Sequence, residues 1–202
     1  MARQHRALQR VIGAAAALGF CAGACAQSGY PGTGSSQPRK GDTFIGIEIG
    51  KPHYETSCGN IAGLSCANNG TSVSVTAGNM FSDNFGAEVS YLDLGKADRA
   101  GGSVDARGLN LSLTGRLPLG DNFDFAGKVG ATYGVTHVNA DPVAGLVNGR
   151  DSGWGLGYGV ALDVHFAHGL SGSVGWEQHD FHFAGQGTSA VKNITVGLSY
   201  AF

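Results

Sequence analysis

The stretch ARGLNLSLTGRLPLGDNFDFAGKVGATYGVTHV, residues Ala106–Val138, contains two runs in which apolar residues alternate with small or polar ones. The first run reads LNLSLT from Leu109 to Thr114, and the second begins at Phe123, after the turn residues Gly120–Asn122. A period of two places successive side chains on opposite faces of a β-strand. The stretch therefore predicts two antiparallel strands joined by a tight turn.

The same period of two recurs on both sides of this hairpin. The predicted strands are about Thr43–Lys51, Thr71–Phe81, Phe85–Leu94, Val104–Leu117, Phe123–Val138, Ser152–Phe166, Leu170–Phe183 and Ala190–Phe202. Tight turns follow the second, fourth and sixth strands, and longer polar connections are expected after the first, third, fifth and seventh. Short turns at one end and longer loops at the other are typical of membrane barrels. The sequence predicts an all-β fold, an eight-stranded antiparallel up-and-down transmembrane β-barrel.

Composition agrees with a wall that faces lipid. Only 14% of the residues are charged, and 35 of the 202 residues are glycine. Eight strands enclose an interior just wide enough for side chains, so small residues on one face suit a narrow lumen. A soluble barrel or sandwich would turn the apolar face inward. Aromatic residues near the strand ends favour the membrane alternative, because they gather at the two interfaces.

The amino-terminal region is typical of an exported protein. Three arginines precede an apolar run from Val11 to Ala24, and small residues follow at Ala24–Ala26. We expect residues 1–26 to be a signal peptide cleaved before Gln27, with lipoprotein processing at Cys25 as a disfavoured alternative. Residues 27–42 are rich in Gly, Ser and Pro and are expected to be a flexible lead-in. Residues 43–202 then form the barrel domain.

Charge and cysteine content point to the same compartment. After removal of the signal, 10 basic residues stand against 15 acidic ones, a net charge of −5 that argues against nucleic acid as a partner. Cys58 and Cys66 remain as an even pair, which in an oxidising compartment predicts a disulfide. The alternative, a metal site, has little support without a nearby histidine pair.

Four stretches resemble the OmpA-like transmembrane β-barrel family of outer-membrane proteins. They are FSDNFGAEVSYLDLGK (Phe81–Lys96), Ala106–Val138, GWGLGYGVALDVHF (Gly153–Phe166) and the ending ITVGLSYAF. The resemblance covers Thr43–Phe202 and implies a location in the Gram-negative outer membrane. It also implies that the closing Phe202 is the signal read by the barrel assembly machinery. It implies little about function, because small barrels serve as structural proteins, adhesins, narrow pores and enzymes.

The inward faces of the predicted strands carry isolated charges. The candidate interior network consists of Glu48, Glu88, Arg116, Lys128, Asp163 and Glu177, with Asp124 beside them. Buried charges need partners, so we expect salt bridges around Lys128 and Arg116. Glu48, Lys128 and Glu177 are expected at mid-barrel depth, and the others nearer the turns. Such a network could plug and rigidify the barrel, or could gate a narrow porin-like channel.

A group of histidines near the end of the chain raises the alternative of an enzyme that modifies lipid A. The group comprises His165, His168, His179 and His182, with Ser173 and Glu177 close in sequence. No acyltransferase or deacylase motif accompanies them, and we assign no catalytic residue, no metal and no cofactor. The sequence favours a non-enzymatic barrel with a structural, envelope-integrity or surface-adhesion role.

The partners expected from the sequence belong to the envelope and the cell surface. Basic residues in or near the predicted loops suggest lipopolysaccharide as a neighbour: Lys96, Arg99, Arg107, Arg150 and Lys192. The longest irregular segment, His53–Gly70, makes host surface molecules a candidate class of partner. The basic residues named above could instead serve only to keep the loops solvated.

Overall fold

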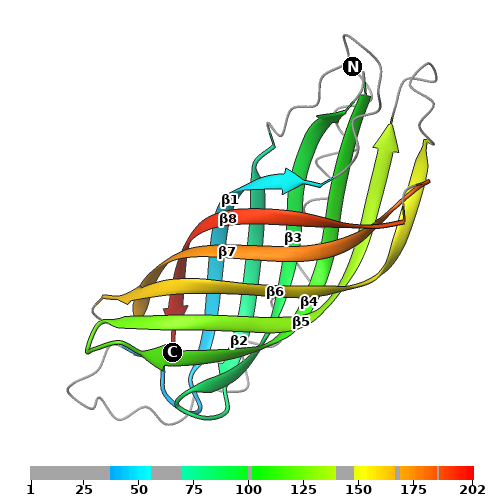
Figure 1. Ribbon diagram of the computed structural model, residues 1–202. Helices are drawn as coiled ribbons and strands as arrows, with labels where there is room; N and C mark the ends of the chain where they lie inside the picture. The colour runs from blue at the N-terminus through cyan, green and yellow to red at the C-terminus, as the bar shows by residue number, and fades with distance from the viewer. Residues whose placement is uncertain (1–36, 56–69, 100–101, 140–147, 167–168, 186) are drawn as a thin grey trace, which may run out of the picture. The chain divides into compact units, whose positions relative to one another are not determined.

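The barrel predicted from the sequence is present in the structure. The computed structural model describes residues 37–55, 70–99, 102–139, 148–166, 169–185 and 187–202. Its strands are β1 (Thr43–Tyr54), β2 (Ser72–Met80), β3 (Phe85–Arg99), β4 (Gly102–Pro118), β5 (Phe123–Asn139), β6 (Gly149–His165), β7 (Leu170–Phe183) and β8 (Gly187–Ala201). They pair in chain order as a closed antiparallel barrel (Figure 1), which confirms the predicted fold class.

Pairing between the first and last strands closes the barrel. Their register runs from Phe44 opposite Ala201 to Tyr54 opposite Val191. Thr43 and Phe202 exchange two backbone hydrogen bonds of 3.0 and 2.9 Å at the lower end of this seam. Within the described residues, no helix combines the length and apolar character that a membrane span requires.

The two faces of the wall differ as the alternation predicts. Ile47, Leu111 and Val196 point outward and are 52%, 65% and 56% exposed. They therefore do not meet in a central core. The inward positions between them carry small or polar side chains, of which Thr132 is fully buried and Asn110 is 3% exposed. The apolar face is thus directed to the surroundings, as in a barrel that faces lipid.

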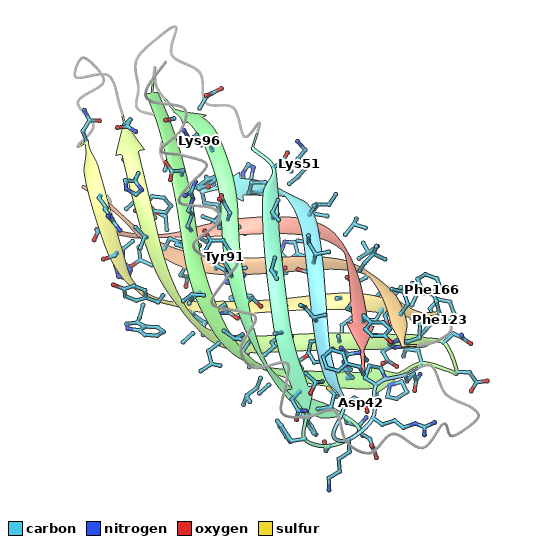
Figure 2. All side chains as sticks on the ribbon, turned by 180° about the vertical axis from the view of Figure 1, so that it is seen from behind. Asp42, Lys51, Tyr91, Lys96, Phe123 and Phe166 are labelled. Atoms are coloured by element: carbon cyan, nitrogen blue, oxygen red, sulfur yellow. The ribbon has the colours of Figure 1, made fainter. Side chains whose placement is uncertain are left out.

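The two ends of the barrel can be told apart. The connections of four residues after β2, β4 and β6 lie at the same end as the carboxyl terminus (Figure 1). Phe123 and Phe166 lie at this end near Asp42, whereas Lys51 and Lys96 lie toward the other (Figure 2). We call these the turn end and the outer end.

The last residues of the predicted lead-in dock against the turn end. The Gln37 side-chain amide donates to the Gly120 carbonyl at 2.8 Å, and the Lys40 backbone N–H donates to an Asp83 carboxylate oxygen at 3.0 Å. Pro38 between them is buried. This segment therefore connects the β4–β5 turn to the β2–β3 turn.

Two outer connections differ from the prediction. β3 ends at Arg99 and β4 begins at Gly102, and only three residues separate β7 from β8. The expectation of longer connections after the third and seventh strands was therefore wrong. Near the outer end the strands carry apolar residues on the inward face and polar residues on the outward face, the reverse of the pattern expected for a strand that faces lipid. The prediction therefore ended these strands too early, although they continue in the structure.

The inversion builds an apolar core inside the outer end. Within the lipid-facing part of β4, leucines point outward, but past Gly108 the apolar Val104 and Ala106 point inward and are fully buried. The core formed in this way, which we call the outer plug, contains Tyr54, Leu94, Ala97, Val104, Ala106, Val138, Phe181, Phe183 and Val191. Burial raises the pKa of the Tyr54 phenol, which stays protonated and donates to the carbonyls of Leu94 and Gly95 at 3.1 and 2.9 Å.

The outer part of β7 bends inward to complete the plug. Pairing of β6 with β7 extends outward only to Gly157 and His179, and beyond them β7 pairs with β8 alone. A Cβ at Gly155 would collide with the Asp180 carbonyl, and one at Gly134 would collide with the Phe181 ring. Thr136 Oγ1 donates to the His182 carbonyl at 2.5 Å. Glycines on β5 and β6 thus leave room for β7 against their inner faces.

The plug makes a testable contribution to stability. Phe181→Ala should lower the free energy of unfolding by about 3–5 kcal/mol, because it removes a fully buried ring and leaves a cavity. The measurement is denaturant unfolding of the protein in detergent micelles. Phe125→Ala is the matched control and should cost less, since its 45%-exposed ring lies on the outer wall, where detergent fills the space. Equal effects of the two substitutions would show that the plug is not a packed core.

Candidate functional site

The inward charges form two clusters, the first around Lys128. Lys128 Nζ lies 3.5 Å from Glu177 Oε1 and 3.8 Å from Glu88 Oε1. Ser112 donates a hydrogen bond to Glu88 at 3.1 Å. Glu48 accepts a hydrogen bond from Ser74 at 3.1 Å and interacts electrostatically with Lys128 and Glu177. One ammonium group therefore faces three carboxyl groups from β1, β3 and β7.

The second cluster surrounds Arg116 and lies nearer the turn end. Arg116 Nη1 is 3.6 Å from Asp163 Oδ2 and 3.9 Å from Asp124 Oδ2. The guanidinium also lies over the Phe44 ring, 5.5 Å from its centroid, a distance suited to a cation–π contact. Glu88, which we expected nearer the turns with this group, reaches Lys128 instead. The two basic residues thus each hold their own set of acids.

Each cluster includes a buried histidine between a carboxylate and a hydroxyl group. His165 bonds Asp124 at 2.8 Å and Ser171 at 2.7 Å. His179 bonds Glu177 at 2.8 Å and Thr132 at 2.9 Å. These hydrogen-bonded side chains extend the polar layer across the lumen. They give the buried imidazole and hydroxyl groups partners that water cannot easily supply.

The Ser171–His165–Asp124 chain has the residue types of a hydrolase triad, but it lacks the setting. Ser171 is 4% exposed and points into the barrel. Its hydroxyl meets Nδ1 of the imidazole, whereas Nε2 faces the acid, which reverses the usual arrangement. Ser173, the serine considered from the sequence, is not part of it. The three residues connect β5, β6 and β7 through these two hydrogen bonds.

A small cavity with several charged lining residues lies between the two clusters. Its volume is about 80 Å³, and its charged lining consists of Glu48, Glu88, Arg116, Lys128 and Asp163. This space suits a few water molecules. In the part of the chain that the structure describes, no three potential ligands are grouped to hold a metal ion.

Several residues singled out in the sequence lie elsewhere. Cys58, Cys66 and His168 fall outside the described residues, so their disulfide and their role stay predictions. His182 belongs to the inward-bent end of β7, far from the His165 cluster along the strand. Phe202 is exposed at the turn end and bonded to Thr43, and its role in assembly stays a prediction.

Sequence reasoning missed the hydroxyl and amide partners of the histidines. Asn110 donates to Thr132 at 2.8 Å, and Thr132 in turn meets His179. These residues come from β4, β5 and β7, and their contact depends on how far the strands are staggered. The contact between Ser171 and His165 could have been predicted, because the two residues stand opposite each other across the tight turn between β6 and β7.

Comparison with known proteins gives this geometry a context. Among solved structures, Neisserial surface protein A matches with a TM-score of 0.64 at 12% identity, covering 81% of this chain and 100% of that one. OprG from Pseudomonas aeruginosa gives 0.54 at 15% identity, covering 83% and 99%. Ail, the attachment invasion locus protein of Yersinia pestis, gives 0.53 at 15% identity, covering 81% and 99%. At such identities the likeness shows the fold alone.

The family follows from the sequence itself. No curated protein matches this chain. The family model described as the outer membrane protein beta-barrel domain matches residues 12–202, nearly the whole chain. Since the match spans every strand and the structure has the closed barrel that such proteins share, this chain belongs to the outer membrane protein β-barrel domain family.

Proposed function

We propose that the protein is a non-enzymatic, non-conducting barrel that supports the outer membrane and holds its outer segments for contact at the cell surface. The observation that carries this proposal is the closure of the lumen by the outer plug, in which Phe181 and Phe183 are fully buried. A solute entering from outside would have to displace this packed apolar core. The function therefore resides in the wall and its outer end, and the lumen serves as a support.

The charged clusters support the same view. Lys128 and Arg116 each face acids from other strands and so tie the wall together across the lumen. Pro38 and its neighbours contact the turns at the opposite end. A narrow porin-like channel gated by these ion pairs is the alternative, and it would require both the ion pairs and the plug to rearrange.

A role at the surface has support from the neighbours and from the shape of the strands. One similar protein is named a surface protein and another an attachment invasion locus protein. In this chain β3–β6 are 15 to 17 residues long. Membrane strands need only about 9–11 residues, so these strands reach beyond the bilayer. The proposal includes export through a signal peptide in residues 1–26 and insertion by the barrel assembly machinery.

Stability should depend on the lysine at the centre of the first cluster. Lys128→Ala leaves Glu88 and Glu177 buried without their cation, which should lower the free energy of unfolding by about 3–5 kcal/mol. Unfolding in denaturant from detergent micelles measures the effect. Lys40→Ala, which removes an exposed lysine at the turn end, should change little. Similar values for both would mean that the cluster does not brace the wall.

Ion conductance separates the proposal from the channel alternative. In planar lipid bilayers the parent protein should give no discrete current steps, and neither should Lys128→Ala, because the outer plug stays in place. Phe181→Ala with Phe183→Ala in one chain should allow small currents if the plug is the barrier. Defined steps in the parent that change on Lys128→Ala would support the gated channel instead.

Cellular tests address the role itself. A strain that lacks the protein should become more permeable to antibiotics or attach less to host cells, and the Ser171→Ala variant should restore it as fully as the parent chain. Mass spectra of lipid A should be the same with and without overexpression. A change in lipid A that Ser171→Ala abolishes would contradict the non-enzymatic assignment and reinstate a lipid-modifying enzyme.

A further inference from the structure

The outward rows of side chains change chemistry at the outer end. On β1 the row Ile45, Ile47, Ile49 is followed by Lys51, and on β8 the row that reaches Ile194 is followed by Lys192. On β4 the three outward leucines are followed by Arg107. The lipid-facing band therefore ends in cations on β1, β4 and β8.

The turn end lacks such a border. There the outward rows finish in apolar side chains, among them Phe85, Phe123, Phe166 and Phe202. The turns below them carry Asp83 and Asp121. Figure 2 shows the contrast, with Phe123 and Phe166 at the turn end and Lys51 and Lys96 toward the outer end. The border of cations on the outward rows is therefore a feature of the outer ends of β1, β4 and β8.

A β-bulge aims one of these cations outward. The register of β3 with β4 shifts between Asp93 and Lys96, and Gly95 inside the shift has a φ of 65°. After the shift Lys96 lies opposite Asp105 and is exposed, while Ala97 enters the outer plug. Without the shift the alternation would turn Lys96 into the apolar core.

The cations of the outer end differ in whether a described carboxylate pairs with them. Lys192 pairs with Glu55, and Arg107 pairs with Asp93 at 3.1 Å. Over the described ranges, neither Lys51 nor Lys96 has a carboxylate within 4.0 Å. Their ammonium groups are thus available to an external anion.

These two lysines lie on either side of the segment that leads into β2. Lys51 Nζ donates to the Gly70 carbonyl at 3.4 Å, and a Cβ at Gly70 would lie 2.6 Å from the Lys96 carbonyl. β2, the strand between their own strands, begins only at Ser72. Below them the outward side chains of Ile49, Val73 and Tyr91 are 57%, 41% and 47% exposed. Two cations therefore lie beyond this outward strip, and Asp93, which stands opposite Val73, is paired with Arg107.

We infer that Lys51 and Lys96 bind phosphate groups of lipopolysaccharide in the outer leaflet, with the strip of Ile49, Val73 and Tyr91 against its acyl chains. Lysine binds phosphate as a point charge, and long side chains at a membrane interface extend toward the head groups. Lipopolysaccharide is the source we favour because Lys51 and Lys96 border the lipid-facing band at the outer end. This inference rests on the proposed placement of that end at the cell surface.

The test uses phosphorylated and dephosphorylated lipid A as ligands for the full barrel in detergent micelles. The parent should bind the phosphorylated form more tightly, and binding should weaken as salt is raised. The double variant Lys51→Gln, Lys96→Gln should bind it at least about tenfold less tightly, as expected for the loss of two cations at a lipid surface. Titration calorimetry or native mass spectrometry gives the affinities.

Controls separate a site from general attraction. Lys40→Gln removes an exposed lysine from the turn end and should leave the affinity unchanged. Heat-dependent gel mobility checks that each variant is folded, and the two single variants replace the double one if it is not.

Unchanged affinity in folded variants, or equal binding of dephosphorylated lipid A by the parent, would overturn the inference. Millimolar inorganic phosphate should compete only weakly, because it lacks the acyl chains; strong competition would point to a site for free phosphate. None of these results depends on conductance or attachment, so the inference and the proposed function can fail separately.

Discussion

Hydrogen bonding of the backbone in a medium without water is the constraint on which this structure depends. Within lipid every N–H and C=O group needs a partner inside the protein, and a sheet meets this need only when it closes on itself. The pairing of β1 with β8, from Phe44 to Tyr54, closes it here. Closure with eight strands fixes a narrow lumen, and the narrow lumen determines which side chains the inward positions accept.

The wall crosses two solvents, and its side-chain pattern changes where the solvent changes. In the lipid band, leucines such as Leu111 face outward and polar residues such as Asn110 fill the lumen. Beyond the band the strands stand in water, so Val104 and Phe181 turn inward and pack as in a soluble protein. The outer end of the barrel therefore contains a small apolar core, the outer plug, formed by inward side chains of the strands themselves. That core lies beyond the polar lumen, at the outer end.

The charges of the lumen and those of the outer wall play different parts in this arrangement. Inside, Lys128 and Arg116 are each surrounded by acids, because an unpaired buried charge would be costly. Outside, no described carboxylate pairs with Lys51 or Lys96 at the border of the lipid band, and we infer that an anionic head group is their partner there. Lysine thus stabilises the wall inside the barrel, and on the outer surface it is available to bind an anion.

The sequence by itself determined the fold class, the number of strands, the face of each residue in the lipid band and the inward position of residues such as Lys128. These follow from a period of two, which is local. It did not determine the outer plug, the inward bend of β7, or which acid meets which base. Glu88 reaches Lys128, and Asn110, Thr132 and His179 meet, only because of the stagger between strands far apart in the chain. Stagger is set by closure of the whole sheet, so only the tertiary structure could decide those contacts.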